Sequence, residues 1–395
     1  MPPRISVWAY PWDLADEGVD PALDWLADHG FDAIELCPNY HAISTFSPRN
    51  RRRSQFYSEQ GAVYFPARAE RYGRIKPALF SEAEVLAVYE QTSRGAESRG
   101  MQLNAWVIGM FQPWLARTYP DTAVENAFGH RSFAATCPAH PDIQTYLPEM
   151  LADVCDQYSI SSLTLENVGY PDFTYGWVRP RILVHMDAWT QFLAGLCFNE
   201  HSMSAARAHG VDPEEVRSST ARELRERLET VPGPTASQDN LPALVEERCE
   251  ADEEFRGYLE AREQSAIGLV KAIRHALRRS RVRVGVSEAS LGWANHGLRL
   301  ADLLDTIGAL MISDPTNNPE VADAQVQTVR DSGADIEITV NQTAHHEVDP
   351  HGPGLVARVH RLREIDPDRV MVYNFGLLAP ATLAHAGTVL REHLG

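Results

Sequence analysis

The feature that most constrains the fold is a series of eight short runs rich in β-branched and aromatic residues, with helical patterns between them. Runs of this length and composition predict β-strands. Strict alternation of strand and helix indicates a parallel sheet with right-handed crossovers, and eight such units close as a (β/α)8 TIM barrel, an α/β fold. The predicted strands cover residues 5–10, 33–37, 103–109, 162–166, 282–287, 309–313, 336–341 and 370–374.

An open, doubly wound sheet is the main structural alternative. The commonest nucleotide-binding form of that fold carries a G-x-G-x-x-G turn after its first strand, and this chain has none there. Apolar runs such as 282–286 and 307–312 are more continuous than alternating, as expected for strands covered on both faces. The helices predicted between the strands cover residues 21–29, 81–99, 141–157, 298–304, 319–332 and 354–365.

Two connections are too long to be simple loops, although residues 1–395 are predicted to form a single barrel domain. The first, 38–77, follows the second strand and is rich in aromatic residues, which favours an ordered wall over the barrel mouth. The second, 195–280, follows the fourth strand. It holds two amphipathic stretches, 213–230 and 241–279, separated by a Pro- and Gly-containing breaker. We expect a helical insertion that serves as a lid or as a homo-oligomer contact.

The charge balance excludes several classes of partner. The 54 acidic and 36 basic residues give a net charge of −18, which repels nucleic acid and anionic membranes over most of the surface. The basic run 49–53 is the local exception, either a solvated loop face or a grip for an anion. Five widely spaced cysteines without a C-x-x-C pair argue against a disulfide framework and a zinc site. With no signal-like or membrane-spanning segment, we expect a cytoplasmic protein.

Three carboxylates are candidate catalytic residues because they follow predicted strands. Side chains at the C-terminal ends of barrel strands point into the shared mouth where chemistry is done. Glu166 ends the fourth strand, Glu288 follows the fifth and Asp314 follows the sixth. Glycoside cleavage usually takes two carboxyl groups, an acid that protonates the leaving oxygen and a carboxylate that attacks or activates water. Each is also compatible with a solvated loop carboxylate, and Asp314 begins a sequence that favours a turn.

Aromatic and amide side chains accompany these carboxylates at the strand ends. Aromatic faces stack on the C–H surfaces of sugars, and amides bond ring hydroxyls in either direction. We therefore expect a small carbohydrate or glycoside as the substrate, and no cofactor. The candidate substrate-binding residues are Trp8, Tyr10, Tyr40, His41, Trp106, His130, Asn167, Tyr170, Asn341 and Asn374.

Other polar residues admit two interpretations. Glu35, inside the second strand, either projects into the barrel mouth or forms a buried ion pair with a lysine or arginine. The adjacent pair His345 and His346 either binds substrate or metal through one member or is structural.

Residues 126–167 resemble a known family. The sequences Asn126-Ala-Phe-Gly-His, Cys137-Pro-Ala-His-Pro-Asp and Leu163-Thr-Leu-Glu-Asn are similar to the region between the third and fourth strands of uncharacterised bacterial glycoside-hydrolase-like TIM barrels. The resemblance implies that Glu166 is the carboxylate of a sugar site.

A second resemblance implies different chemistry. Residues 23–36 look like the first helix and second strand of xylose-isomerase-like barrels, in which glutamates bind a divalent metal with Asp and His. Glu166 fits the first metal position, but the eighth strand ends Val372-Tyr-Asn-Phe-Gly, without the final Glu ligand of that family. The favoured hypothesis is a two-carboxylate glycosidase. The alternatives are a metal-dependent sugar isomerase or epimerase, and a barrel that binds a sugar without cleaving it.

Overall fold

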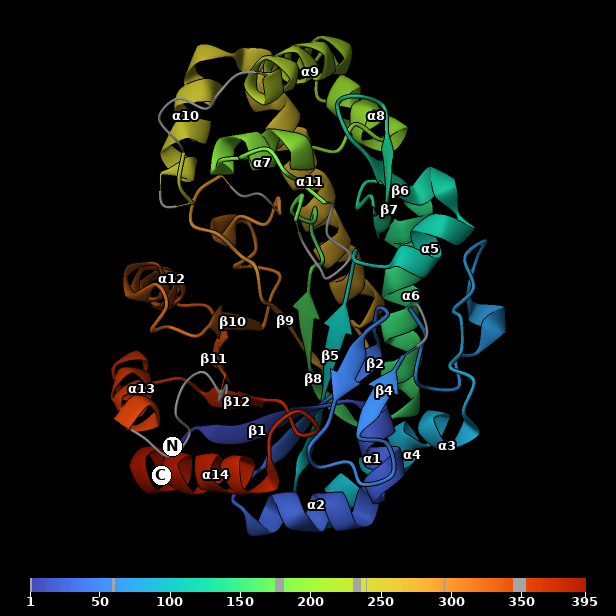
Figure 1. Cartoon of the computed structure of the whole chain (residues 1–395), viewed down its shortest axis with the longest axis vertical. Helices are drawn as coiled ribbons and strands as arrows, with labels where there is room; N and C mark the ends of the chain where they lie inside the picture. Colours follow the sequence, from blue (N-terminus) through green and yellow to red (C-terminus); the bar gives the residue numbers. More distant parts are fainter. Residues whose placement is uncertain are drawn as a thin grey trace.

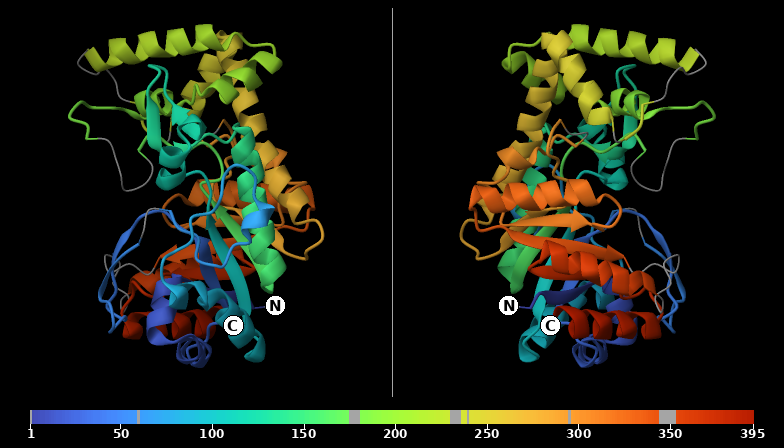
Figure 2. Two further views of the ribbon diagram at one scale, coloured as in Figure 1. Left: turned by 90° about the vertical axis from the view of Figure 1, so that its right-hand side faces the viewer. Right: turned by 90° about the vertical axis from the view of Figure 1, so that its left-hand side faces the viewer.

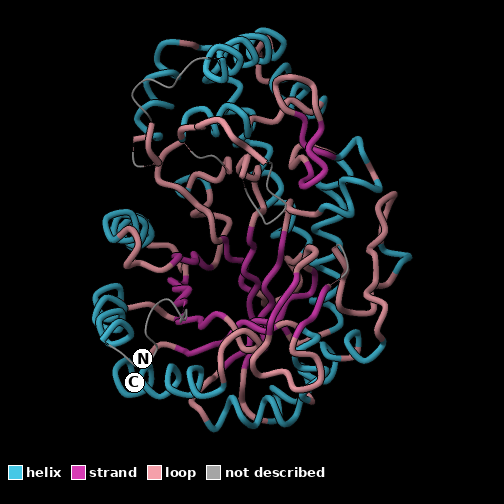
Figure 3. Tube along the Cα trace, in the orientation of Figure 1, coloured by secondary structure: helices cyan, strands magenta, loops and turns pink. Residues whose placement is uncertain are grey.

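The protein forms a closed barrel of eight parallel strands surrounded by helices, which confirms the predicted TIM barrel (Figures 1 and 3). The computed structural model describes residues 2–58, 61–174, 181–229, 236–238, 240–293, 296–343 and 353–395. Around the barrel the strands follow the order β1-β12-β11-β10-β9-β8-β5-β2. Their bounds are Arg4–Ala9 (β1), Ala33–Asn39 (β2), Gln102–Ile108 (β5), Ile160–Glu166 (β8), Arg283–Val286 (β9), Ala309–Ser313 (β10), Glu337–Thr343 (β11) and Arg369–Tyr373 (β12).

All eight barrel strands lie where the sequence predicts them, with ends displaced by at most two residues. They form because both faces are covered. The helices pack on the outer face, and layers of side chains fill the interior, as in other TIM barrels. One interior layer is polar: Asn104 donates a 2.9 Å hydrogen bond to Glu35, and Arg369 Nε lies 3.6 Å from the same carboxylate oxygen. Glu35 therefore belongs to a buried ion pair rather than to the mouth.

The outer helices agree with the sequence in most places. Pro141–Gln157 (α6) and Pro319–Ser332 (α12) have the predicted bounds, and Val19–Asp28 (α2) and Pro353–Ile365 (α13) begin within two residues of them. The predicted helix at 81–99 is divided into Ala83–Leu86 (α3) and Val88–Ser98 (α4). The helix predicted at 298–304 is wrong, because that segment holds only one 3₁₀ turn, Leu300–Asp302 (η3). Helices not predicted are Pro11–Glu17 (α1), Pro113–Thr118 (α5), Ala188–Gly195 (α7), Glu200–Ala208 (α8) and Pro380–Leu394 (α14).

The aromatic connection after β2 packs against the barrel mouth. It contains a hairpin of Ser44–Phe46 (β3) and Gln55–Tyr57 (β4), followed by the short turn Ala69–Arg71 (η1). Phe56 and Tyr64 of this connection join a buried aromatic cluster with Trp12 of α1. The basic run 49–53 is also held by an ion pair, since Arg49 lies 2.6 Å from Glu17.

The described residues between β8 and β9 form five helices, which stand over one end of the barrel (Figure 2). They are Ala188–Gly195 (α7), Glu200–Ala208 (α8), Pro213–Glu229 (α9), Leu241–Ala251 (α10) and Glu253–Ala276 (α11). They share an apolar core that includes Phe192, Phe198 and Phe255. A second hairpin, Ala123–Glu125 (β6) and Arg131–Thr136 (β7), lies beside them (Figure 1). The arrowheads of β5 and β8 point toward this helical layer, so it borders the mouth of the barrel.

No helix in the described part of the chain combines the length and the apolar character needed to cross a bilayer.

Candidate active site

A cavity of about 280 Å³ opens at the C-terminal ends of the barrel strands. This is the end at which TIM-barrel enzymes hold their active sites. Both candidate glutamates line it, together with four large aromatic rings and several small polar side chains. The lining residues are Trp8, Tyr40, Trp106, Glu166, Ser287, Glu288, Met311, Ser313, Asn341 and Tyr373.

Glu166 is fixed by its neighbour on the adjacent strand β5. Trp106 Nε1 donates a hydrogen bond of 2.5 Å to Glu166 Oε2. The indole is only 1% exposed and packs edge-on against Trp8, with ring centroids 4.3 Å apart. A donor held this rigidly both orients the carboxylate and stabilises negative charge on it.

Glu288 is held by the residue that follows Glu166. The backbone N–H of Asn167 donates a 2.7 Å hydrogen bond to Glu288 Oε2. Asn167 adopts a left-handed conformation with φ of 53°, a region that Asn tolerates better than most residues. Burial raises the pKa of Glu288 well above its ordinary value, and the negative charge of Glu166 raises it further, against the lowering effect of the Asn167 N–H. Glu288 therefore keeps its proton at pH values where an exposed glutamate has lost it.

The two carboxyl groups thus lie on neighbouring strands, interact electrostatically and have different surroundings. Glu166 accepts a hydrogen bond from an indole N–H, whereas burial raises the pKa of Glu288. Such a pair divides naturally into a charged carboxylate and a neutral acid.

The aromatic wall has two layers. Trp8, Tyr40, Trp106 and Tyr373 line the cavity. Tyr10 lies behind them, fully buried, with its hydroxyl 2.9 Å from that of Tyr373 and its ring stacked on Trp12. Tyr10 was predicted to bind substrate, but its position is one layer removed from the cavity.

Of the other predicted substrate-binding residues, only Asn341 lines the cavity. Asn167 and Asn374 are fully buried beneath it. His41 stacks on Tyr40 with centroids 4.2 Å apart, and burial lowers the pKa of His41 to about 4, so the ring is neutral near pH 7. His130 lies exposed at the turn of the β6–β7 hairpin, outside the cavity lining.

Asp314 and Tyr170 are placed elsewhere by strong contacts. Asp314 is 5% exposed, pairs with Arg358 at 2.6 Å and accepts a 2.6 Å hydrogen bond from the Thr316 hydroxyl. Tyr170 is fully buried, with its hydroxyl 3.1 Å from Ser202 Oγ and the guanidinium of Arg262 over its ring. Neither residue lines the cavity.

Ser287, Met311, Ser313 and Tyr373 line the cavity but were not among the predicted site residues. Met311 and Ser313 could have been predicted from the alternation of side-chain direction along a strand. They are two residues apart on β10, so their side chains point to the same face, and Asn341 is the register partner of Ser313 on β11.

Three or more ligand side chains close together would mark a candidate metal site. Among the described residues, the one group of three candidate ligands close enough to share an ion is Asp121, His140 and Asp142, away from the mouth. Arg74 already occupies it, with guanidinium nitrogens 2.6 Å from each of the two aspartates. His345 and His346 lie outside the described residues.

The barrel is similar in fold to those of several solved glycoside hydrolases. No protein-family model and no curated protein matches the sequence. Solved structures do match. Alpha-L-fucosidase isoenzyme 2 from Paenibacillus thiaminolyticus has a TM-score of 0.59 at 13% identity, and the match covers 99% of this chain but only 49% of the fucosidase.

Two further structures are similar. The PgaB (BpsB) glycoside hydrolase domain from Bordetella bronchiseptica has a TM-score of 0.57 at 14% identity, with 98% of each chain covered. A beta-galactosidase from the psychrophilic Marinomonas ef1 has a TM-score of 0.56 at 12% identity, covering 98% of this chain and 59% of that one. At these identities the likeness establishes the fold alone.

Proposed function

We propose that the protein is a glycosidase that cleaves a small glycoside or oligosaccharide with Glu166 and Glu288. The observation that carries the proposal is the pairing of two carboxyl groups with unlike surroundings in one aromatic-lined cavity at the barrel mouth. Similarity in fold to several glycoside hydrolases supports it.

In this proposal Glu288 is the general acid. Its pKa is raised by burial and by Glu166, so it carries a proton to give to the glycosidic oxygen. Glu166, with its charge stabilised by Trp106, is the carboxylate that attacks the anomeric carbon or activates water. Trp8, Tyr40 and Tyr373 supply ring faces for the sugar, and Asn341 supplies an amide for its hydroxyls.

Two glutamine variants test these roles on a panel of 4-nitrophenyl and 2,4-dinitrophenyl glycosides. Glu166→Gln should lose at least about 10³-fold in kcat on both leaving groups while still binding the sugar product. Glu288→Gln should lose activity on 4-nitrophenyl glycosides but retain much of it on dinitrophenyl glycosides, because that leaving group departs without protonation.

Glu337→Gln is the matched control. Glu337 is also a strand glutamate but begins β11 at the opposite end of the barrel, 3.4 Å from Arg283. The activity of Glu337→Gln should stay within about twofold of wild type, since half-exposed ion pairs contribute little to stability. Equal losses in all three variants, or unchanged turnover in Glu166→Gln, would refute the assignment.

A further inference from the structure

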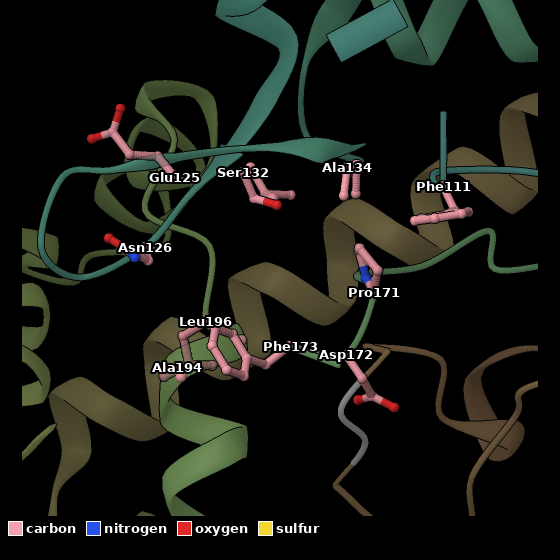
Figure 4. A pocket seen from close by; sticks show the side chains of 13 residues that line it. Phe111, Glu125, Asn126, Ser132, Ala134, Pro171, Asp172, Phe173, Ala194 and Leu196 are labelled. Atoms are coloured by element: carbon pink, nitrogen blue, oxygen red, sulfur yellow. The ribbon is translucent and has the colours of Figure 1, made fainter. Parts of the chain in front are cut away.

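A second pocket adjoins the barrel mouth and is built differently from the catalytic cavity. It measures about 100 Å³ and lies between the β6–β7 hairpin, the loop after β8 and the end of α7. Figure 4 shows Phe173, Ala194 and Leu196 on one side of it and Ser132 and Ala134 on the other.

The pocket shares no lining residue with the cavity of Glu166 and Glu288, but it lies near their strand ends. Met110 donates a backbone hydrogen bond to the carbonyl of Asn167, so the residue after it, Phe111, lies beside the loop that follows Glu166. Phe111 and Asp172 both line the pocket, and the charge of Asp172 contributes to raising the pKa of Glu288. Phe111 also packs edge-on against His41, which stacks on Tyr40 of the catalytic cavity.

A third hollow of about 340 Å³ lies next to this pocket. Asn126, Phe173 and Ala194 line both, so the two hollows share a wall. The far hollow is mostly apolar and ends at Leu183, whose side chain is fully exposed. A row of adjacent, largely apolar hollows, here called the apolar path, therefore extends outward from the neighbourhood of Glu288.

Glu125 and the side-chain oxygen of Asn126, two of the polar groups along the first pocket, already have partners. Glu125 lies 3.2 Å from Arg217 and 3.6 Å from Arg131. Asn126 Oδ1 accepts from two backbone N–H groups of its own turn. Asp172 lies 3.6 Å from His296 Nε2.

Most of the lining consists of ring and methyl surfaces, such as those of Phe111, Phe173 and Leu196, which suit an apolar group better than a second sugar. The first pocket is smaller than the roughly 150 Å³ dry cavity that holds benzene, but it does not have to contain the whole group because the path continues.

We propose that this path binds the aglycone, and that the substrates are glycosides of apolar alcohols, aryl or alkyl, rather than sugars linked to sugars. The proposal rests on the proposed glycosidase function, with the sugar at Glu166 and Glu288 and the leaving alcohol directed toward Phe111 and Phe173. Burying methylene groups along the path should strengthen binding by about tenfold for every two of them.

A binding experiment tests the path without turnover. The probe is 4-methylumbelliferone, a fluorescent aryl alcohol, titrated with wild-type protein and followed by fluorescence anisotropy. Ala194→Trp and Ser132→Trp fill the pocket from opposite walls, and Ser132 is an exposed strand position that tolerates a large side chain. Val321→Trp adds the same indole at an exposed position of α12 and is the control.

We expect both filling variants to weaken binding at least tenfold and the control to match wild type. Glu166→Gln should bind the probe as wild type does, which would show that probe binding does not depend on the candidate catalytic carboxylate. Binding that is unchanged in both filling variants, or absent in wild type, overturns the proposal.

The kinetic experiment compares methyl and octyl glycosides of the same sugar, whose leaving alkoxides are similarly basic. Wild type should prefer the octyl glycoside at least tenfold in kcat/KM, and this ratio should fall to about one in Ala194→Trp and Ser132→Trp. Turnover without any octyl preference refutes the apolar path but leaves the glycosidase intact. Loss of probe binding in the filled variants, with no turnover of either glycoside, supports the apolar path and refutes the glycosidase.

Discussion

Replacing Trp106 with Phe isolates the hydrogen bond that orients Glu166. The substitution keeps an aromatic ring in the wall but removes the N–H that lies 2.5 Å from the carboxylate oxygen. Hydrogen bonds to charged groups contribute about 1.5–3 kcal/mol, so kcat/KM should fall by about 10- to 150-fold if the bond persists in the transition state. The smaller ring also leaves a void in a site only 1% exposed, which lowers the free energy of unfolding.

Trp12→Phe controls for that void. Trp12 belongs to the same aromatic cluster and is fully buried, but its Nε1 has no hydrogen-bond partner among the described residues, and it does not line the cavity. Both variants should lose similar stability in chemical denaturation, while Trp12→Phe keeps kcat/KM within about threefold. Initial rates on an aryl glycoside, measured well below the melting temperature of either variant, give the comparison. Equal kinetic losses would show that packing, and not the hydrogen bond, supports Glu166.

Three further predictions concern two buried carboxyl groups and the effect of removing metal ions. Asp314→Asn should lower the free energy of unfolding by on the order of 3 kcal/mol in urea titrations, because it breaks a buried 2.6 Å pair with Arg358, while kcat of the folded protein is unchanged. Burial raises the pKa of Asp13 from 3.8 to about 7, so the free energy of unfolding of the wild type should fall as pH rises between these values. Asp13→Asn should remove that pH dependence, and its free energy of unfolding should exceed that of wild type by up to about 4 kcal/mol at pH 8. Prolonged dialysis against a chelator should leave the rate of glycoside cleavage unchanged, whereas a metal-dependent isomerase would lose its activity.

The barrel could be predicted from sequence because each strand is short, apolar and bounded by turns. Parallel strands covered on both faces leave continuous apolar runs such as 307–312, which period and composition reveal directly. The segment at 298–304 has the same apolar spacing as a helix but folds into one 3₁₀ turn. There the backbone of Ser290 accepts a hydrogen bond from Leu300 and donates one to Leu298, a tertiary pairing that local sequence does not encode.

Only part of the candidate site could be predicted from the sequence in the same way. Position at a strand end identified Glu166 and Glu288, and the cavity contains both. The same criterion selected Asp314, and it could not reveal that Arg358, from the helix after the next strand, closes over that carboxylate. Tyr170 was selected for its place after Glu166, yet its contacts come from Ser202 and Arg262.

Those contacts of Tyr170 link the helical layer to the two candidate catalytic glutamates. The loop after β8 begins at Asn167, whose N–H binds Glu288 and whose carbonyl accepts from Met110. Three residues later the loop is anchored by Tyr170 between Ser202 of α8 and Arg262 of α11. A displacement of these two helices would therefore shift Asn167 and change the hydrogen bond that Glu288 accepts. The insertion after the fourth strand thus supports the geometry of both glutamates, in addition to forming one wall of the apolar path.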